Sequence, residues 1–378
     1  MKKKWISLFM VAVCMLVFLT GCGQTESEQE MQTEKTNTQD AETENANPEK
    51  SIAENVNTDE TETGNANADE TETEGTIAED TIVVASLKGP TSMGLVGLMD
   101  KAEKKETEAS YEFVMETAAD TILPMVLKGE VDIALIPANV ASVLHNRALE
   151  TAAESDIVVI DINTLGVLYL VTGREDISTM KDLAGKTIYL TGKGTTPEYV
   201  LNYLLAENQV EDVTLEYKSE ATEVAAVLKE NPEAIGLLPQ PFVTAACTQN
   251  EALSVVLDLN EEWTALQGES GSSLVTGVTI ARKAFVEEHS ELVKQFMTEH
   301  KESIAYVNAN PKEAAALVVK AGIVEKEAIA EKAIPNCNLA YLDGEDMKQA
   351  LAGYLEVLYN QNPDSVGGVL PQEEFYYE

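Results

Sequence analysis

The amino-acid sequence predicts an α/β protein of two lobes, each a parallel-rich sheet flanked by helices, joined by two hinge crossings. Three observations support this fold class. Strand-like and helix-like segments alternate along residues 81–378, the same order of segments occurs twice, and two β-rich runs lie where the chain would pass between the lobes. A stretch of about 300 residues is long enough for two lobes of ordinary domain size.

The internal repeat has an offset of about 105 residues. In each copy a strand-like run passes through a turn rich in Gly, Pro, Ser and Thr into a helical pattern, and two further strand and helix pairs follow. Each lobe therefore reads βαβαβα, although any two α/β domains share a pattern of this kind. The predicted strands are 82–85, 111–115 and 131–137 in the first copy, and 187–190, 213–217 and 234–239 in the second.

Two β-rich runs are predicted to connect the lobes, at 163–170 outward and at 274–280 on the return, and a two-crossing hinge permits rigid-body closure. Apolar residues recur at intervals of three and four from Val286 to Ile304, which predicts one face of a long helix. Pro124 should interrupt the hydrogen-bond ladder of another predicted helix. The expected division is therefore lobe 1 at 81–165, lobe 2 at 166–273, and a return strand with C-terminal helices on lobe 1 at 274–378.

The N-terminus has the features of an export signal. Three lysines follow Met1, and residues 5–19 are almost entirely apolar but too few to span a membrane comfortably. The following Leu19-Thr20-Gly21-Cys22 resembles the lipobox of bacterial lipoproteins. The resemblance implies that residues 1–21 are a signal peptide, that Cys22 carries lipid, and that the protein is anchored at the outer face of the cell membrane. An ordinary secretory peptide with a chance cysteine is the alternative.

Residues 22–80 are expected to be the lipidated cysteine followed by a disordered acidic tether. The segment 24–80 contains 18 acidic residues, two lysines and no aromatic residue. Such a composition cannot bury enough apolar surface to offset its chain entropy. The whole chain has a net charge of −39, which argues against nucleic acid as a partner. Cys247 and Cys337, in the folded part, either form one disulfide or stay as buried thiols.

Three phrases in the folded part point to a known family. They are LKGEVDIA at 127–134, MKDLAGKTI at 180–188 and ARKAFVEEH at 281–289. Together with the two-lobed pattern they resemble the nitrate/sulfonate/taurine group of ABC-transporter substrate-binding proteins, which have the type 2 periplasmic-binding fold. The resemblance implies a monomer without cofactor or metal that captures a small-molecule ligand and delivers it to an ABC permease and its ATPase.

Two other classes of function stay open. A ligand-sensing partner of a membrane receptor could use the same fold. An enzyme has less support, because the sequence contains no Gly-x-Ser-x-Gly elbow, phosphate loop or cysteine-pair zinc pattern. The spacing of His289 and His300 suits the packed face of a helix better than a metal site. Acidic residues are abundant, so paired carboxylates are not ruled out by composition. We expect binding and no catalysis.

The ligand of an open α/β sheet lies beyond the carboxyl ends of the strands, where helix N-termini present free N–H groups. Four turns follow predicted strands at such positions. Asn139 and Gln240 are the stronger predictions for side-chain contacts, since each comes just after a strand. The full set of predicted ligand-binding residues is Gly89, Pro90, Thr91, Ser92, Met93, Asn139, Gly194, Thr195, Thr196 and Gln240.

Several of these residues also have a purely structural explanation. The hydroxyl groups in the two threonine- and serine-containing turns could cap helices, and the glycines could simply make the turns. Trp263 and Tyr199 could stack on a flat ligand or pack in a core. The chain has three arginines, Arg147, Arg174 and Arg282, so few groups could clamp an anion in bidentate fashion. We therefore expect a small polar or weakly anionic organic ligand, sulfonate-like or a nitrogen heterocycle.

Changing Cys22 to Ala removes the expected lipid site. We expect the variant to leave the membrane fraction and appear in the soluble fraction, because stable anchoring needs the lipid chains. Fractionation of cells followed by immunoblotting measures this, with Cys14→Ala in the signal segment as the matched control. A Cys22→Ala protein that stays membrane-bound would contradict the anchor.

Overall fold

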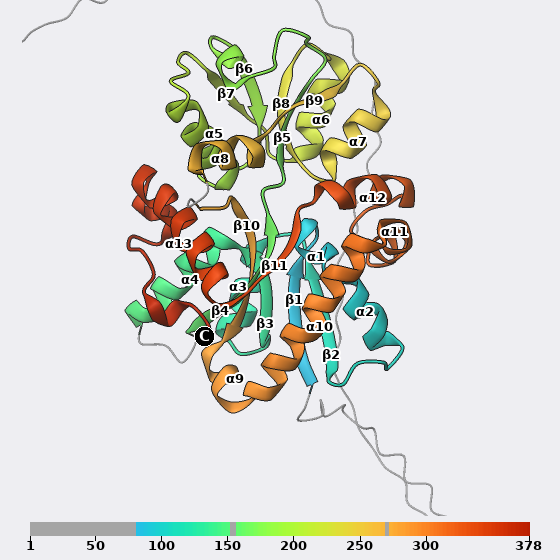
Figure 1. Ribbon diagram of the computed structural model, residues 1–378, viewed down its shortest axis with the longest axis vertical. Helices are drawn as coiled ribbons and strands as arrows, with labels where there is room; N and C mark the ends of the chain where they lie inside the picture. Colours follow the sequence, from blue (N-terminus) through green and yellow to red (C-terminus); the bar gives the residue numbers. More distant parts are fainter. Residues whose placement is uncertain (1–80, 152–155, 269–271) are drawn as a thin grey trace, which may run out of the picture. The chain divides into compact units, whose positions relative to one another are not determined.

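The computed structural model describes residues 81–151, 156–268 and 272–378. The expected signal peptide, Cys22 and the acidic tether lie outside the described residues. Two mixed sheets carry the described chain, in the orders β11-β4-β10-β3-β1-β2 and β7-β6-β8-β5-β9 (Figure 1). The strands are β1 (Thr81–Leu87), β2 (Ser110–Glu116), β3 (Ile133–Pro137), β4 (Ile157–Leu165), β5 (Leu168–Thr172), β6 (Thr187–Leu190), β7 (Thr214–Tyr217), β8 (Ile235–Pro239), β9 (Ser254–Asp258), β10 (Val275–Arg282) and β11 (Leu339–Leu342).

Helices cover both sheets (Figure 1). The α-helices are α1 (Pro90–Met93), α2 (Val96–Glu103), α3 (Ala119–Leu127), α4 (Ala138–Thr151), α5 (Thr196–Glu207), α6 (Ala221–Glu230), α7 (Phe242–Gln249), α8 (Leu259–Gln267), α9 (Lys283–Glu288), α10 (Ser290–Ala309), α11 (Pro311–Lys320), α12 (Glu327–Ala333) and α13 (Gly344–Gln361). The short 3-10 helices are η1 (Met180–Leu183), η2 (Ile334–Asn336), η3 (Pro363–Val366) and η4 (Glu373–Phe375).

The two sheets repeat one strand order. Three parallel strands stand in the order β2-β1-β3 in the first sheet and β7-β6-β8 in the second. An antiparallel strand then follows the third, β10 beside β3 and β5 beside β8. Each of these added strands is the one by which the chain enters that sheet from the other. The predicted class, a two-lobed α/β fold with parallel-rich sheets, is confirmed.

The outward crossing is divided between two strands. β4 ends at Leu165 in the first sheet and β5 begins at Leu168 in the second, so the β-rich run predicted at 163–170 is interrupted at Gly166. A Cβ atom at Gly166 would lie 2.7 Å from Leu274 Cδ2, just before β10, and 2.7 Å from Asn260 Cβ in α8. The two crossings therefore pack against each other at Gly166, where there is no space for a side chain.

Two local predictions need correction. The long helix expected from Val286 to Ile304 is two helices, α9 and α10, because the backbone leaves helical geometry at His289 (φ −132°, ψ 42°). Pro124 lies inside α3 and does not end it; the buried residues Ile122 and Val126 hold the helix on the sheet. The C-terminal helices, which were predicted to lie on the first lobe, also reach the second sheet's helices, since α12 contacts α7 and α13 contacts α5.

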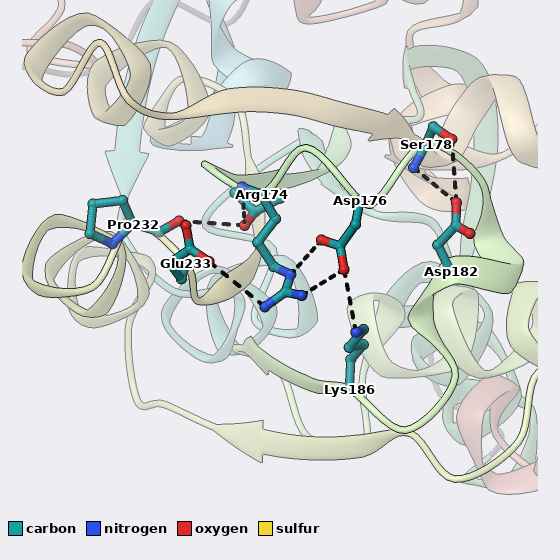
Figure 2. Close-up of polar contacts among 8 residues, drawn as sticks. Arg174, Asp176, Ser178, Asp182, Lys186, Pro232 and Glu233 are labelled. Carbon is teal, nitrogen blue, oxygen red and sulfur yellow. Dashed lines mark hydrogen bonds and ion pairs between the residues drawn. The ribbon is translucent and has the colours of Figure 1, made fainter.

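The segment between β5 and β6 is fixed by polar contacts (Figure 2). Arg174 forms a two-pronged ion pair with Asp176 (Nε–Oδ1 2.8 Å, Nη2–Oδ2 2.6 Å), and Lys186 lies 3.6 Å from the same carboxylate. Asp182 accepts hydrogen bonds from the backbone N–H groups of Ser178 (3.0 Å) and Thr179 (2.8 Å) and closes a capping box on η1. This segment determines where β6, and the turn that follows it, begin.

We expect Asp182→Asn to lower the free energy of unfolding at neutral pH and to have little effect in acid. Hydrogen bonds from the Ser178 backbone and from Thr179 lower the pKa of Asp182, so its contribution exists above the ordinary carboxyl range and disappears as the pH falls through the folded-state pKa. Urea unfolding as a function of pH measures this, with Glu175→Gln, at an exposed neighbour, as the control. An equal destabilisation at every pH would contradict the charge-dependent cap.

Candidate functional site

The turn after β1 is tied to its own strand. Gly89, with φ 150°, precedes α1 and Pro90 occupies its first turn. Thr91 Oγ1 donates to the carbonyl of Leu87 (3.2 Å), and Ser92 Oγ bonds to Ser86 Oγ (2.8 Å). Neither hydroxyl caps the helix, and both residues are buried. These hydroxyls therefore position the turn, and the part that faces open space is the backbone.

The turn after β6 has the same character. Thr195 stands at the N-cap of α5 but makes no side-chain cap; its hydroxyl donates to the carbonyl of Gly192 (2.7 Å). The carboxylate of Glu198 accepts from the backbone N–H of Gly194 and from Tyr217 Oη (2.7 Å). A Cβ atom at Gly194 would meet nothing within 4 Å, and the same holds at Gly89 in the corresponding turn of the first sheet. Both glycines thus leave space for an approaching molecule, although the N–H of Gly194 is already bonded to Glu198.

A hydrogen bond between Thr196 and Asn139 links a helix that follows the first sheet's β3 to a helix that follows the second sheet's β6. Thr196 Oγ1 donates to Asn139 Oδ1 (3.4 Å), which joins the start of α5 to the start of α4. Two residues from the C-terminal part complete this group: Tyr354 Oη donates to Thr196 Oγ1 (3.5 Å), and Asn139 Nδ2 donates to the carbonyl of Ser365 (3.3 Å). The bonds across this junction are long, so a ligand with better geometry could replace them.

Gln240 lies in different surroundings. Its backbone N–H donates to the carbonyl of Val167 in the hinge (3.1 Å), and its Oε1 accepts from the hydroxyl of Thr244 (2.8 Å). The side chain lines a cavity of about 640 Å³ that includes none of the other predicted ligand-binding residues. Met93, also predicted as a ligand contact, is fully buried beside Cys337, with 3.5 Å between the two sulfur atoms.

A group of buried polar residues on β4 and β10, which the sequence did not indicate, lies next to the turn after β1. Asp161, on β4, is fully buried; it accepts from Thr279 Oγ1 (2.7 Å) and lies 3.2 Å from His300 Nδ1. The chain of bonds continues from Thr279 to Asn163, beside Gly277 and Thr91. No periodicity marks these residues, because β4 and β10 are buried on both faces and their polar side chains pair only after the strands have met.

Trp263 and Tyr199, the two aromatic residues that could have stacked on a ligand, differ in how deeply they are buried. Trp263 is completely buried between Tyr203 and Tyr354, and its Nε1 donates to the carbonyl of Ser272 (2.9 Å). It therefore packs and offers no stacking surface. Tyr199 is only partly buried, and its hydroxyl accepts from Asn362 Nδ2 (3.1 Å).

Two of the three arginines are engaged elsewhere. Arg282 Nη2 lies 2.6 Å from Asp132 Oδ1, and Arg174 is paired with Asp176.

The two cysteines of the described part are free thiols, and burial raises the pKa of Cys337 to about 12. No cluster of three or more His, Cys, Asp or Glu residues suited to a metal ion occurs among the described residues. Within those same ranges, no helix has the length and apolarity needed to cross a bilayer.

Comparison with protein families matches residues 110–314 to the NMT1/THI5-like family. The chain belongs to this family. The match begins at β2 and ends in α11, so it includes both crossings and most of both sheets. No curated protein matches the sequence of this NMT1/THI5-like protein.

Solved structures share the fold of this family member. An ABC transporter structure from Parabacteroides distasonis aligns with a TM-score of 0.66 and 23% identity, over 79% of this chain and 99% of the other. The aliphatic sulphonate-binding protein SsuA of Escherichia coli gives 0.61 and 15%, over 79% and 92%. The nitrate-binding protein NrtA of Synechocystis gives 0.53 and 12%, over 76% and 84%. At such identities the likeness establishes the fold, the two-lobed type 2 periplasmic-binding fold that the sequence predicted.

We expect Gly277→Ala to destabilise the protein by about 1–3 kcal/mol, the usual effect of an extra methyl group in a packed core. The new Cβ would lie 2.5 Å from Thr91 Cγ2 and 2.6 Å from Asn163 Oδ1, so the turn after β1 must move. Denaturant unfolding measures the change. Thr276→Val is the control on the same strand, because the buried Thr276 hydroxyl has no hydrogen-bond partner in the described part of the chain. Equal stability of Gly277→Ala and the wild type would contradict the packing.

Proposed function

We propose that this protein is an extracytoplasmic solute-binding lipoprotein that captures a small polar or weakly anionic organic molecule between its lobes and delivers it to an ABC permease and its ATPase. One observation carries the proposal: Thr196, in the first turn of α5, donates to Asn139, in the first turn of α4, and these two helices follow strands of different sheets. A solute at this junction would touch both lobes at once, which is how a binding protein couples capture to closure.

Membership of the NMT1/THI5-like family and the fold shared with sulphonate- and nitrate-binding proteins support transport. A lipid on Cys22 would keep the protein at the membrane beside its permease. The lobes would be 81–165 with 274–378, and 166–273, and they would rotate about Gly166 and Leu274. The protein would act as a monomer and bind without catalysis.

The ligand class follows from what the turns offer. The turns have open space at Gly89 and Gly194, although the N–H of Gly194 is bonded to Glu198, and Asn139 and Thr196 supply an amide and a hydroxyl. Arg174 and Arg282 are paired with carboxylates outside these turns. Uncharged donors suit a sulfonate-like anion or a nitrogen heterocycle better than a multiply charged molecule. Thr91, Ser92 and Thr195 would contribute by holding these turns in place.

A thermal-shift panel of alkanesulfonates, nitrate, pyrimidines and flavins tests the proposal. A ligand present at 100 times its Kd should stabilise the protein by about 2.7 kcal/mol. Asn139→Ala and Thr196→Val should each weaken a hit about tenfold, since each removes one polar contact and leaves its partner unpaired. Asn208→Ala, at the far end of α5, is the control. Unchanged affinity in both site variants would contradict the placement of the ligand.

A further inference from the structure

The cavity of about 640 Å³ that Gln240 lines lies on the β9 side of the second sheet. Its walls come from the start of β5, from β9 and from α7, with Lys332 of α12 and Asn336 of η2 also lining it, and it is open to solvent. Tyr169 Oη donates to the carbonyl of Asn336 (2.7 Å), which joins β5 to η2 at the cavity wall. The residues that matter for its chemistry are Tyr169, Gln240, Asp258, Glu261, Lys332 and Asn336.

Gln240 presents an unused donor to this cavity. Only 3% of the residue is exposed, and its Oε1 accepts from the backbone N–H of Thr244 (3.3 Å) and from the Thr244 hydroxyl (2.8 Å). A backbone N–H can only donate, so the orientation of the amide is fixed with Nε2 at the other end. Nε2 donates to no residue in the described ranges. Gln240 lines the cavity, so an acceptor on a bound molecule could take up this free donor.

The charges around the cavity are of both signs and unpaired. Asp258 and Glu261 contribute carboxylates, and Lys332 contributes an ammonium group. None of the three takes part in an ion pair within the described part of the chain. Asp258 Oδ1 caps α8 by accepting from the Asn260 N–H (2.8 Å), and burial raises the pKa of Asp258, as expected for a carboxylate without a cationic neighbour.

We propose that this cavity is a second ligand site, which binds a small zwitterion carrying a protonated amine and a carboxylate. The amine would lie at Asp258 and Glu261, and the carboxylate would accept from Gln240 Nε2 and Lys332 Nζ. A cation alone would leave the Gln240 donor and the Lys332 charge unused, and an anion alone would face two carboxylates. Since Lys332 stands on α12 and Asp258 on β9, the ligand would also join the C-terminal helices to the second sheet.

Calorimetric titration of the full chain with unbranched ω-amino acids, from glycine to 6-aminohexanoate, tests the proposal. At least one should bind, and the alkylamine and the alkanoate of the same length should bind at least about tenfold more weakly, because each lacks one charge-assisted contact. No binding by any member, or equal binding by a truncated analogue, would overturn it.

Matched variants separate this site from the junction of Asn139 and Thr196. Asp258→Asn keeps an oxygen to cap α8, and Gln240→Glu keeps the oxygen that Thr244 needs; each should weaken the zwitterion about tenfold or more. Glu262→Gln, next to Glu261 but outside the cavity wall, should not change binding. Asn139→Ala should also leave it unchanged. If Asn139→Ala abolishes zwitterion binding, the ligand occupies the junction and the second site is refuted.

Discussion

The exchange of one strand between the two sheets is the constraint on which the rest of the structure depends. β10 enters the first sheet from the second half of the chain, and β5 enters the second sheet from the first half. Each lies antiparallel beside the last of three parallel strands. Neither sheet can therefore complete its hydrogen bonding without the other half of the chain, and the two connections must run side by side. Gly166 is the position at which they touch.

This arrangement explains why buried polar residues gather on β4 and β10. The two strands are central in the first sheet and covered on both faces, so a polar side chain there needs a partner from the neighbouring strand or from α10. Asp161 has such partners in Thr279 Oγ1 and His300 Nδ1, although His300 Nε2 has no partner in the described part of the chain. Their network ends beside Gly277 and fixes the turn after β1. The hinge strands thus support the same edge of the sheet at which a ligand would bind.

Most polar side chains at the strand ends are already hydrogen-bonded within their own turns. Hydroxyl groups at Thr91, Ser92 and Thr195 bond back to their own turns, and Glu198 holds the N–H of Gly194. Side chains therefore shape the turns, and the amide of Asn139 and the hydroxyl of Thr196 are the polar groups that meet between the lobes. The C-terminal segment takes part as well, because Ser365 bonds to Asn139, and Asn146 on α4 donates to the carbonyl of Val366 (2.8 Å).

Local sequence patterns determined a large part of this protein. The alternation of strand and helix signals, repeated at an offset of about 105 residues, was enough to predict two similar α/β lobes and the turns at their strand ends. Those signals are local, so they do not depend on which strands become neighbours. They placed Asn139 and Thr196 at strand ends, and the tertiary structure brings these two together.

Only the tertiary structure decided which side chains share a site. Gln240 has the same sequence setting as Asn139, yet it lines a cavity that Asn139 does not reach, together with Lys332 of α12 and Asn336 of η2. Tyr354 and Ser365 reach Thr196 and Asn139 from more than 150 residues away, and nothing in their own neighbourhood marks them. The fold class follows from short-range periodicity, whereas a binding site is made by long-range packing, which no local pattern contains.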